Sequence, residues 1–189
     1  GEEGLISSLD YWDTKGIVHY GAYRSQEDAD TIKTMEVNGI KFAFLGYMEH
    51  TNGNYLSGDG AQVIYLEDED KIKAQIEEAD KMADVVVVSC HYGTEIQNEL
   101  NKQQTEITPK LVEWGADLII GTQAHTISTC GYLDKPDGGQ AFVYYGLGNF
   151  ISTMYDTKSL VGLIGKLNVV KDPGTNEVTF ENVKAIPII

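Results

Sequence analysis

An α/β fold with a mixed sheet is predicted by three patterns in the sequence. Between residues 40 and 120, apolar runs typical of buried strands alternate with amphipathic helical segments. From residue 127 onward, strand-like runs are separated by turn residues, as in antiparallel sheets. Three apolar runs also stop at a small residue followed by polar side chains, and ligands bind at such strand ends in open α/β sheets. We therefore expect one domain, residues 1–189, with a site at its strand ends.

Length and charge limit the classes of function. The 189 residues are enough for one domain with a hydrophobic core. No apolar run is long enough to cross a bilayer, and no basic-then-apolar leader is present. Because the sequence begins at Gly1 without a methionine, we expect a segment upstream of it. The net charge of −15 argues against a nucleic-acid partner, and an anionic ligand would need a local positive centre such as a metal ion.

The first elements are expected to be a helix and a short strand. Leu5, Leu9 and Trp12 recur at helical spacing, and the helix they predict ends before Gly16. Residues 17–20 have the composition of a short strand.

A helical turn and a hairpin should follow. Ser25 can cap a helical turn through its hydroxyl oxygen. Residues 31–37 and 40–45 are separated by Asn38-Gly39, a dipeptide that accepts the positive φ angles of a tight hairpin turn. Residues 49–60 are rich in Asn, Gly and Ser and predict an exposed loop.

The middle of the chain predicts a parallel βαβ unit. Residues 71–82 form an amphipathic helical pattern, and 84–89 and 118–120 are buried strand patterns. Residues 98–114 are expected to be helical but interrupted, because Pro109 must start or kink a helix, with Thr108 as the cap of a second piece.

The last third is expected to be mainly antiparallel. Strand-like runs occupy residues 127–133, 140–145, 160–170 and 177–186, separated by turn-forming glycines and prolines. Cys90 and Cys130 are too few for a disulfide framework; one bridge between them is possible, but we expect two buried free thiols.

The candidate chemistry lies at the strand ends. His91 and His125 each follow a buried strand pattern, and neutral imidazole is the commonest side chain for binding zinc, iron or manganese. Glu95 could be a ligand, a partner of a ligand or a general acid–base, and Asn149 could ligate a metal or bind an oxyanion. Purely structural roles also remain open for these residues, and they are our interpretation of His19 and His50.

Other catalytic motifs are absent from the sequence. It contains no glycine-rich phosphate loop with its lysine, no nucleophile elbow and no paired CxxC. Cys90 and His91 are neighbours on a strand and should point to opposite faces, which argues against a Cys–His dyad.

Three ordered motifs resemble the CapA family of poly-γ-glutamate capsule biosynthesis proteins. Residues 89–95, Ser-Cys-His-Tyr-Gly-Thr-Glu, resemble its His-Trp-Gly-x-Glu motif. Residues 115–125, Gly-Ala-Asp-Leu-Ile-Ile-Gly-Thr-Gln-Ala-His, resemble the motif that ends in Gly-x-His-Pro-His, and residues 145–151 resemble its Ser-Leu-Gly-Asn-Phe motif. The hairpin at 38–47 also resembles the family's central hairpin, so the resemblance covers nearly the whole chain.

The resemblance implies a fold and a site. The family is similar to calcineurin-like metallophosphoesterases, which have a four-layer α/β/β/α sandwich with mixed sheets and a two-metal centre. The resemblance implies a divalent Mn, Zn or Fe ion held by His91 and His125, with a metal site that is incomplete in this chain. The residues that it assigns to catalysis are His91, Glu95 and Asn149, and those that it assigns to substrate binding are Tyr92, Gly93, Gln123 and Gly148.

This chain departs from the family pattern in two ways. Gln123 and Ala124 stand where the family has His and Pro, and a glutamine amide is a much poorer ligand for a transition metal than imidazole. The family's early Asp-containing and Asn-Asn-His motifs are expected upstream of Gly1, so the chain corresponds to the C-terminal half to two-thirds of a member and lacks its N-terminal part.

Three functional hypotheses follow. The first is metal-assisted hydrolysis or transfer on a cell-surface anionic polymer such as poly-γ-glutamate, by a protein anchored in the membrane through its upstream segment. The second is a non-catalytic binding or assembly subunit of a capsule machine with membrane-bound synthesis proteins, which Gln123 favours. The third, an intracellular phosphoesterase, is favoured only by the lack of a leader.

Overall fold

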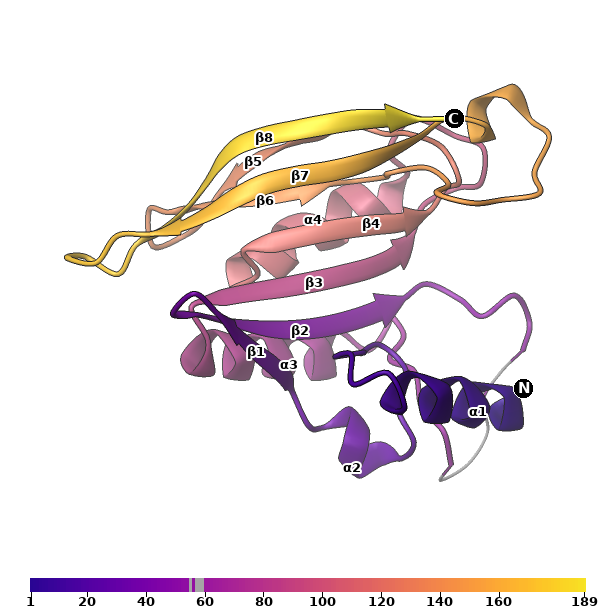
Figure 1. Ribbon diagram of the computed structural model, residues 1–189, viewed down its shortest axis with the longest axis horizontal. Helices are drawn as coiled ribbons and strands as arrows, with labels where there is room; N and C mark the ends of the chain where they lie inside the picture. Colours follow the sequence, from indigo (N-terminus) through magenta and orange to yellow (C-terminus); the bar gives the residue numbers. More distant parts are fainter. Residues whose placement is uncertain (55, 57–59) are drawn as a thin grey trace. The chain divides into compact units, whose positions relative to one another are not determined.

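The chain folds into two compact units. The computed structural model describes residues 1–54, 56 and 60–189. Its contacts group into Gly1–His91 and Tyr92–Ile189, and each unit has its own helices and strands (Figure 1). That residues 1–189 act as a single domain stays a prediction.

The first unit is built around a three-stranded mixed sheet. Strands β1 and β2 are antiparallel and β2 and β3 are parallel, in the order β1-β2-β3. Asn38 and Gly39 turn the hairpin with φ angles of 53° and 79°, as expected of two residues that accept positive φ. The elements are α1 (Glu2–Asp13), α2 (Gln26–Ala29), β1 (Lys33–Val37), β2 (Ile40–Met48), α3 (Glu69–Met82) and β3 (Val85–Tyr92), whose last residue opens the second unit.

Helix α3 makes the crossover between the parallel strands β2 and β3. Asp68 caps it by accepting a hydrogen bond from the backbone N–H of Lys71. Ile72, Ile76 and Ala79 on one face of α3 are fully buried, and the helix packs against β2. The expected cap at Ser25 is also confirmed, because the Ser25 side chain accepts from the N–H of Asp28 at the start of α2.

Residues 17–20 are not a strand, and this prediction was wrong. The segment crosses a face of the sheet instead, where the Tyr20 ring packs on Phe44 with centroids 5.3 Å apart and its hydroxyl lies 2.9 Å from that of Ser89. At Gly46 a Cβ atom would lie 2.7 Å from the Cα of Gly21. Side-chain packing and close backbone approach therefore replace strand pairing here.

The second unit contains two sets of strands and one long helix. In the first set, β4 and β6 are parallel and β6 and β5 antiparallel, in the order β4-β6-β5; β7 and β8 form an antiparallel ribbon. The mainly antiparallel C-terminal third is thus confirmed. The elements are α4 (Lys102–Trp114), β4 (Leu118–Gln123), β5 (Cys130–Asp134), β6 (Gln140–Tyr144), the 3₁₀ turn η1 (Thr157–Ser159), β7 (Gly162–Lys171) and β8 (Val178–Ile188).

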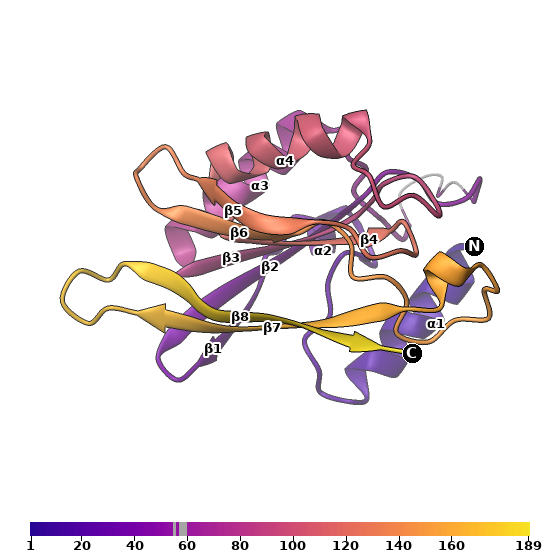
Figure 2. The same cartoon turned by 90° about the horizontal axis from the view of Figure 1, so that it is seen from above.

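Within this unit the elements stack as helix, sheet and ribbon. Seen from above, α4 lies over one side of β4, β5 and β6 and the β7–β8 ribbon over the other (Figure 2). Two tyrosines join sheet and ribbon, because the hydroxyl of Tyr132 donates to the carbonyl of Phe180 and that of Tyr144 to the carbonyl of Lys184. This α, β, β succession follows the layer order that the family resemblance implies.

Helix α4 runs without interruption through Pro109, so the expected second piece capped by Thr108 was wrong. Asn101 begins the helix: its side chain accepts from the backbone N–H of Gln104, whose side chain accepts in return from the N–H of Asn101. Residues buried before and after the proline, Ile107 and Leu111, hold the helix in the unit although Pro109 removes one backbone hydrogen bond.

The two cysteines differ in their surroundings. Within the described residues neither forms a disulfide; Cys90 is buried, as expected, and Cys130 is exposed, which corrects that expectation. Burial raises the pKa of the Cys90 thiol, so this group is an inert part of the core. In the part of the chain that the structure describes, no helix has the length and apolar character needed to cross a membrane.

The Asn101 cap provides a test of the fold. We expect Asn101→Ala to lower the free energy of unfolding by about 1 kcal/mol, because both reciprocal hydrogen bonds of the cap are lost. Urea unfolding followed by circular dichroism measures this. Lys102→Ala is the matched control, since its ion pair with Glu106 is exposed and contributes little. Equal midpoints for the two variants would show that the cap does not stabilise α4.

Candidate functional site

The end of β4 has an unusual backbone. Gln123 and His125 have φ angles of 87° and 57°, and Ile96, on the neighbouring loop, has a φ of 58°. Within residues 1–54, 56 and 60–189, the other non-glycine residues with positive φ are all asparagines, which tolerate this conformation. The backbone N–H of Ile96 donates to the carbonyl of Ala124 at 2.9 Å. This hydrogen bond joins the loop that carries Ile96 to the turn that carries Gln123 and His125.

Side-chain hydrogen bonds hold this turn in place. The hydroxyl of Thr126, which is fully buried, donates to the carbonyl of Gln97 at 2.7 Å, and that of Ser128 donates to the carbonyl of Asn98 at 2.7 Å. Each non-glycine residue in the left-handed region costs about 1–3 kcal/mol and persists only where its surroundings fix it. Such strain concentrates at functional sites, which supports a site at this strand end.

His125 is oriented by Asn149. The Asn149 side-chain nitrogen donates to the carbonyl of Ser159 at 3.1 Å, which leaves its oxygen as the acceptor that faces Nδ1 of His125 at 2.8 Å. Nδ1 of His125 must then carry the proton, and Nε2 is the nitrogen with the lone pair. A histidine that donates one ring N–H to an oxygen and presents the other nitrogen has the arrangement of a metal ligand or a general base.

Glu95 and Gln123 complete a group that we call the strand-end cluster: Glu95, Gln123, His125 and Asn149. The side-chain amide of Gln123 lies 3.5 Å from a carboxylate oxygen of Glu95, a long hydrogen bond. Gln123 is buried, whereas Glu95 is exposed. The second unit thus brings together four of the residues that the sequence predicted, and it shows Asn149 as a residue that positions His125.

The other residues predicted to bind substrate shape the backbone near this cluster. Tyr92 is fully buried, and its hydroxyl lies 3.0 Å from that of Thr108 on α4. Gly93 has a φ of 113°, and Gly148 has a φ of 70° at a point where a Cβ would lie 2.8 Å from the carbonyl oxygen of Val161. Tight packing therefore explains these two glycines, and their part in substrate binding stays a prediction.

His91 lies in the first unit beside a second imidazole that sequence reasoning treated as structural. In the β2–β3 register Met48 is opposite His91, and the backbone N–H of Glu49 donates to the His91 carbonyl at 2.8 Å. The next residue, His50, has its ring centroid 6.4 Å from that of His91, at an interplanar angle of 74°. The sequence alone would have predicted this pair only if the register between β2 and β3 had been known.

The two residues predicted as ligands have suitable chemistry for Mn, Zn or Fe. His125 in the second unit presents a nitrogen lone pair, and His91 in the first unit carries an imidazole; that one ion binds both stays a prediction. Within the described ranges, however, no three His, Cys, Asp or Glu side chains are grouped so that they could hold a metal ion. At position 123, where the family motif has an imidazole, this chain has an amide, which is a poorer ligand.

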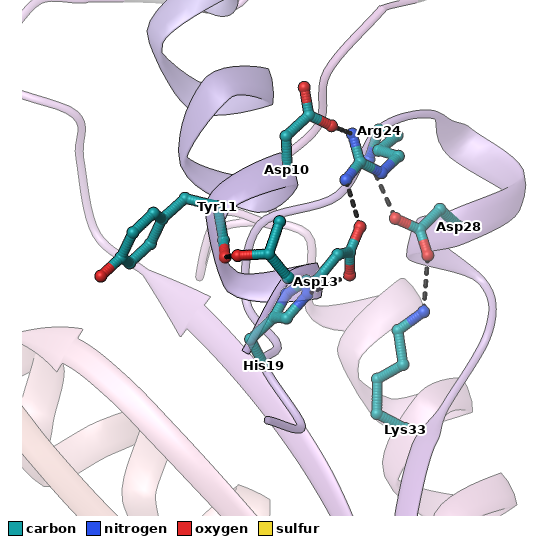
Figure 3. A network of polar contacts seen from close by, with 8 residues as sticks. Asp10, Tyr11, Asp13, His19, Arg24, Asp28 and Lys33 are labelled. Atoms are coloured by element: carbon teal, nitrogen blue, oxygen red, sulfur yellow. Dashed lines mark hydrogen bonds and ion pairs between the residues drawn. The ribbon is translucent and has the colours of Figure 1, made fainter. Parts of the chain in front are cut away.

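His19 belongs to a network of paired charges in the first unit (Figure 3). Its Nε2 lies 2.9 Å from a carboxylate oxygen of Asp13, and Arg24 bridges Asp13 and Asp10. The hydrogen bond from His19, together with Arg24, holds the pKa of Asp13 below its usual range. A cavity of about 450 Å³ lies beside the network, but its cations Arg24 and Lys33 are both paired with carboxylates. These contacts support the structural role predicted for His19.

The fold is of the metallophosphatase type. The structure of the NAD nucleotidase of Haemophilus influenzae superimposes on 88% of this chain and 29% of that one, with a TM-score of 0.53. The two sequences are 12% identical, so the likeness concerns the fold alone.

The family is shown by sequence. The family described as "Bacterial capsule synthesis protein PGA_cap" matches residues 1–154, and the chain belongs to this family, as its three motifs predicted. It is 28% identical over 152 residues to the "PGA biosynthesis protein CapA" of Bacillus subtilis and 25% identical over 155 residues to the "Capsule biosynthesis protein CapA" of Bacillus anthracis. Each alignment covers 80% of this chain but only 39% and 36% of those proteins.

The contact between His125 and Asn149 gives a spectroscopic prediction. Asn149→Ala removes the acceptor of the Nδ1 proton, which contributes about 1 kcal/mol, so we expect the ratio of the two His125 tautomers to change roughly fivefold toward Nε2–H. Long-range ¹H–¹⁵N spectra of the histidine rings report this ratio. The signals of His19, which lies in the other unit, serve as the internal control. An unchanged His125 tautomer would mean that Asn149 does not set it.

Proposed function

We propose that this chain takes part in the synthesis or processing of poly-γ-glutamate capsule polymer, through metal-assisted hydrolysis or transfer at an amide or phosphoester bond. The family and its CapA relatives support the polymer as the class of substrate. The observation that carries a catalytic role is the hydrogen bond from Nδ1 of His125 to Asn149, because it presents Nε2 for coordination at a strained strand end.

Each residue has a proposed role in this scheme. His91 and His125 act as ligands of a divalent Mn, Zn or Fe ion, which would polarise the bond to be broken when it is bound. Glu95, exposed at the same strand end as His125, moves protons, and Asn149 keeps His125 in its ligating tautomer. Tyr92, Gly93, Gln123 and Gly148 form the substrate side, where the amide of Gln123 can donate a hydrogen bond to a carbonyl or carboxylate oxygen.

Charge explains why a cation is needed. The chain carries a net charge of −15, and a polymer of glutamate is itself an anion. A divalent ion at the strand ends would supply the local positive field that attracts such a ligand. We also propose that the protein acts at the cell surface, anchored in the membrane next to capsule-synthesis proteins.

A second candidate function is a binding or assembly subunit that does not catalyse. Gln123 favours it, because it occupies the place of a histidine in the family motif and its amide engages Glu95 rather than presenting an imidazole. In this case the strand-end cluster would hold polymer without cleaving it.

Removal of both imidazoles tests the leading proposal. In the full-length protein we expect the His91→Ala, His125→Ala double variant to lose at least tenfold in affinity for Mn²⁺ or Zn²⁺, and hydrolytic activity with it, because two ligands are gone. Elemental analysis and calorimetry measure the binding. His19→Ala, which removes an imidazole paired with Asp13, is the control. Wild-type metal content in the double variant would contradict the assignment.

Restoring the family's ligand separates the two candidates. Gln123→His should raise affinity for Zn²⁺ at least tenfold and create or increase hydrolysis if Gln123 is the cause of a weakened metal site. Gln97→His, an exposed position in the same unit, controls for adding a histidine to the chain. If Gln123→His changes neither metal affinity nor hydrolysis, the idea of a degenerate metal site is wrong.

A further inference from the structure

The segment from Asn149 to Gly162, which we call the 149–162 loop, has closed ends. The backbone N–H of Leu163 donates to the carbonyl of Leu147 at 2.7 Å and joins the two sides of the loop at its base. At Gly162 a Cβ atom would clash with the carbonyl oxygen of Asn149, so the two ends pack backbone against backbone. Compact surface loops of this kind are held by their own inward-facing groups and are frequently functional.

The inner residues of the 149–162 loop contact the strand-end cluster. Four large apolar side chains of the loop are exposed, namely Phe150, Ile151, Tyr155 and Leu160. By contrast, Ser159 is buried and Met154 is half-buried. The carbonyl oxygen of Ser159 lies 3.1 Å from the side-chain nitrogen of Asn149, and the sulfur of Met154 lies 3.7 Å from it. The loop is therefore connected to the cluster through the Asn149 amide.

These two contacts fix the orientation of that amide. A carbonyl oxygen and a thioether sulfur are both hydrogen-bond acceptors, and an amide nitrogen has two N–H groups to donate. The nitrogen of Asn149 therefore faces the loop, and its oxygen faces Nδ1 of His125, 2.8 Å away. If the amide were reversed, an N–H would point at Nδ1, and the proton of the neutral ring would have to be on Nε2. The orientation of one amide thus decides which nitrogen of His125 keeps its lone pair.

Asp156 holds the turn that presents the Ser159 carbonyl. The carboxylate of Asp156 accepts from the backbone N–H of Lys158 at 2.9 Å and caps η1. The carbonyl of Asp156 accepts from the N–H of Ser159 at 2.9 Å and from its hydroxyl at 2.8 Å. One residue therefore bonds three groups of the turn whose last carbonyl receives the hydrogen bond from Asn149.

We propose that Asp156 is a positioning residue for His125. By capping η1 it holds the Ser159 carbonyl against Asn149, and the Asn149 amide then keeps the His125 proton on Nδ1 and the lone pair on Nε2. Met154 supports the same orientation of the amide as a weaker acceptor. This inference rests on the proposed function, in which His125 is a ligand through that lone pair, and Asp156 acts on it only through Ser159 and Asn149.

Removal of the cap tests the inference. In the full-length protein, freed of metal by a chelator, we expect Asp156→Ala to shift the ratio of the two His125 tautomers about threefold toward Nε2–H, because the hydrogen bond from Asn149 is weakened. Asp156→Asn should keep the wild-type ratio, since its amide oxygen can also cap a turn. Long-range ¹H–¹⁵N spectra of the histidine rings measure the ratio. Asp172→Ala is the matched control, because the Asp172 carboxylate accepts from two backbone N–H groups of the turn between β7 and β8.

A second variant measures the same effect without touching the cap. Ser159→Ala removes the hydroxyl that donates to the Asp156 carbonyl and leaves the backbone hydrogen bond between these residues in place. We expect a shift of the His125 ratio in the same direction as in Asp156→Ala, but a smaller one. This variant provides the test if Asp156→Ala does not fold.

The outcomes separate this inference from the proposed function. If the wild-type protein binds no metal but the His125 ratio responds to Asp156→Ala and not to Asp172→Ala, the metal proposal fails and the inference stands. If the protein binds metal through His125 but the ratio is unchanged in both Asp156→Ala and Ser159→Ala, the inference is wrong and the proposed function stands. An equal shift in Asp172→Ala would also overturn the inference, because loosening of any turn in the unit would then suffice.

Discussion

The hydrogen bond between the backbone N–H of Ile96 and the carbonyl of Ala124 is the constraint on which the strand-end cluster depends. It joins the loop after β3 to the turn after β4, and the residues at this junction, Ile96, Gln123 and His125, all have positive φ. Relaxation of any one of these angles would redirect its side chain. The free energy of this arrangement must come from buried partners such as Thr126, so the geometry of the site is set by the surrounding fold.

Two asparagines contact two histidines in different ways. Asn149 accepts from Nδ1 of His125 with its side chain, and Asn52 donates to Nδ1 of His50 with its backbone. In the neutral ring of His125 the first contact leaves the lone pair on Nε2. The two contacts thus engage Nδ1 of each ring in a different way, one as a donor and one as an acceptor.

Much of the fold was predictable because its signals are local. The Asn38-Gly39 turn, the apolar face of α3 and Gly115 at the end of α4 each depend on residues within a few positions. Errors arose where distant residues decide the outcome. The segment 17–20 packs on Phe44 instead of pairing, and α4 continues through Pro109 because residues before and after the proline, such as Ile107 and Leu111, are buried. For the site, motif spacing predicted His91 and His125. The neighbourhood of His50 and His91 depends on the strand register, which no local pattern contains.

The contact between Gly21 and Gly46 has a consequence for how this chain can vary. A Cβ at position 46 would lie 2.7 Å from the Cα of residue 21, and Gly21 has a φ of 89°. A side chain at position 46 would require the segment that carries Tyr20 to lift from the sheet, and one at position 21 would be strained by the positive φ. Substitution at these two sites is therefore constrained, whereas the nearby Ile17 and Val18 are exposed. The two glycines act as a spacer that sets the distance between the segment and β2, whatever side chains the segment carries elsewhere.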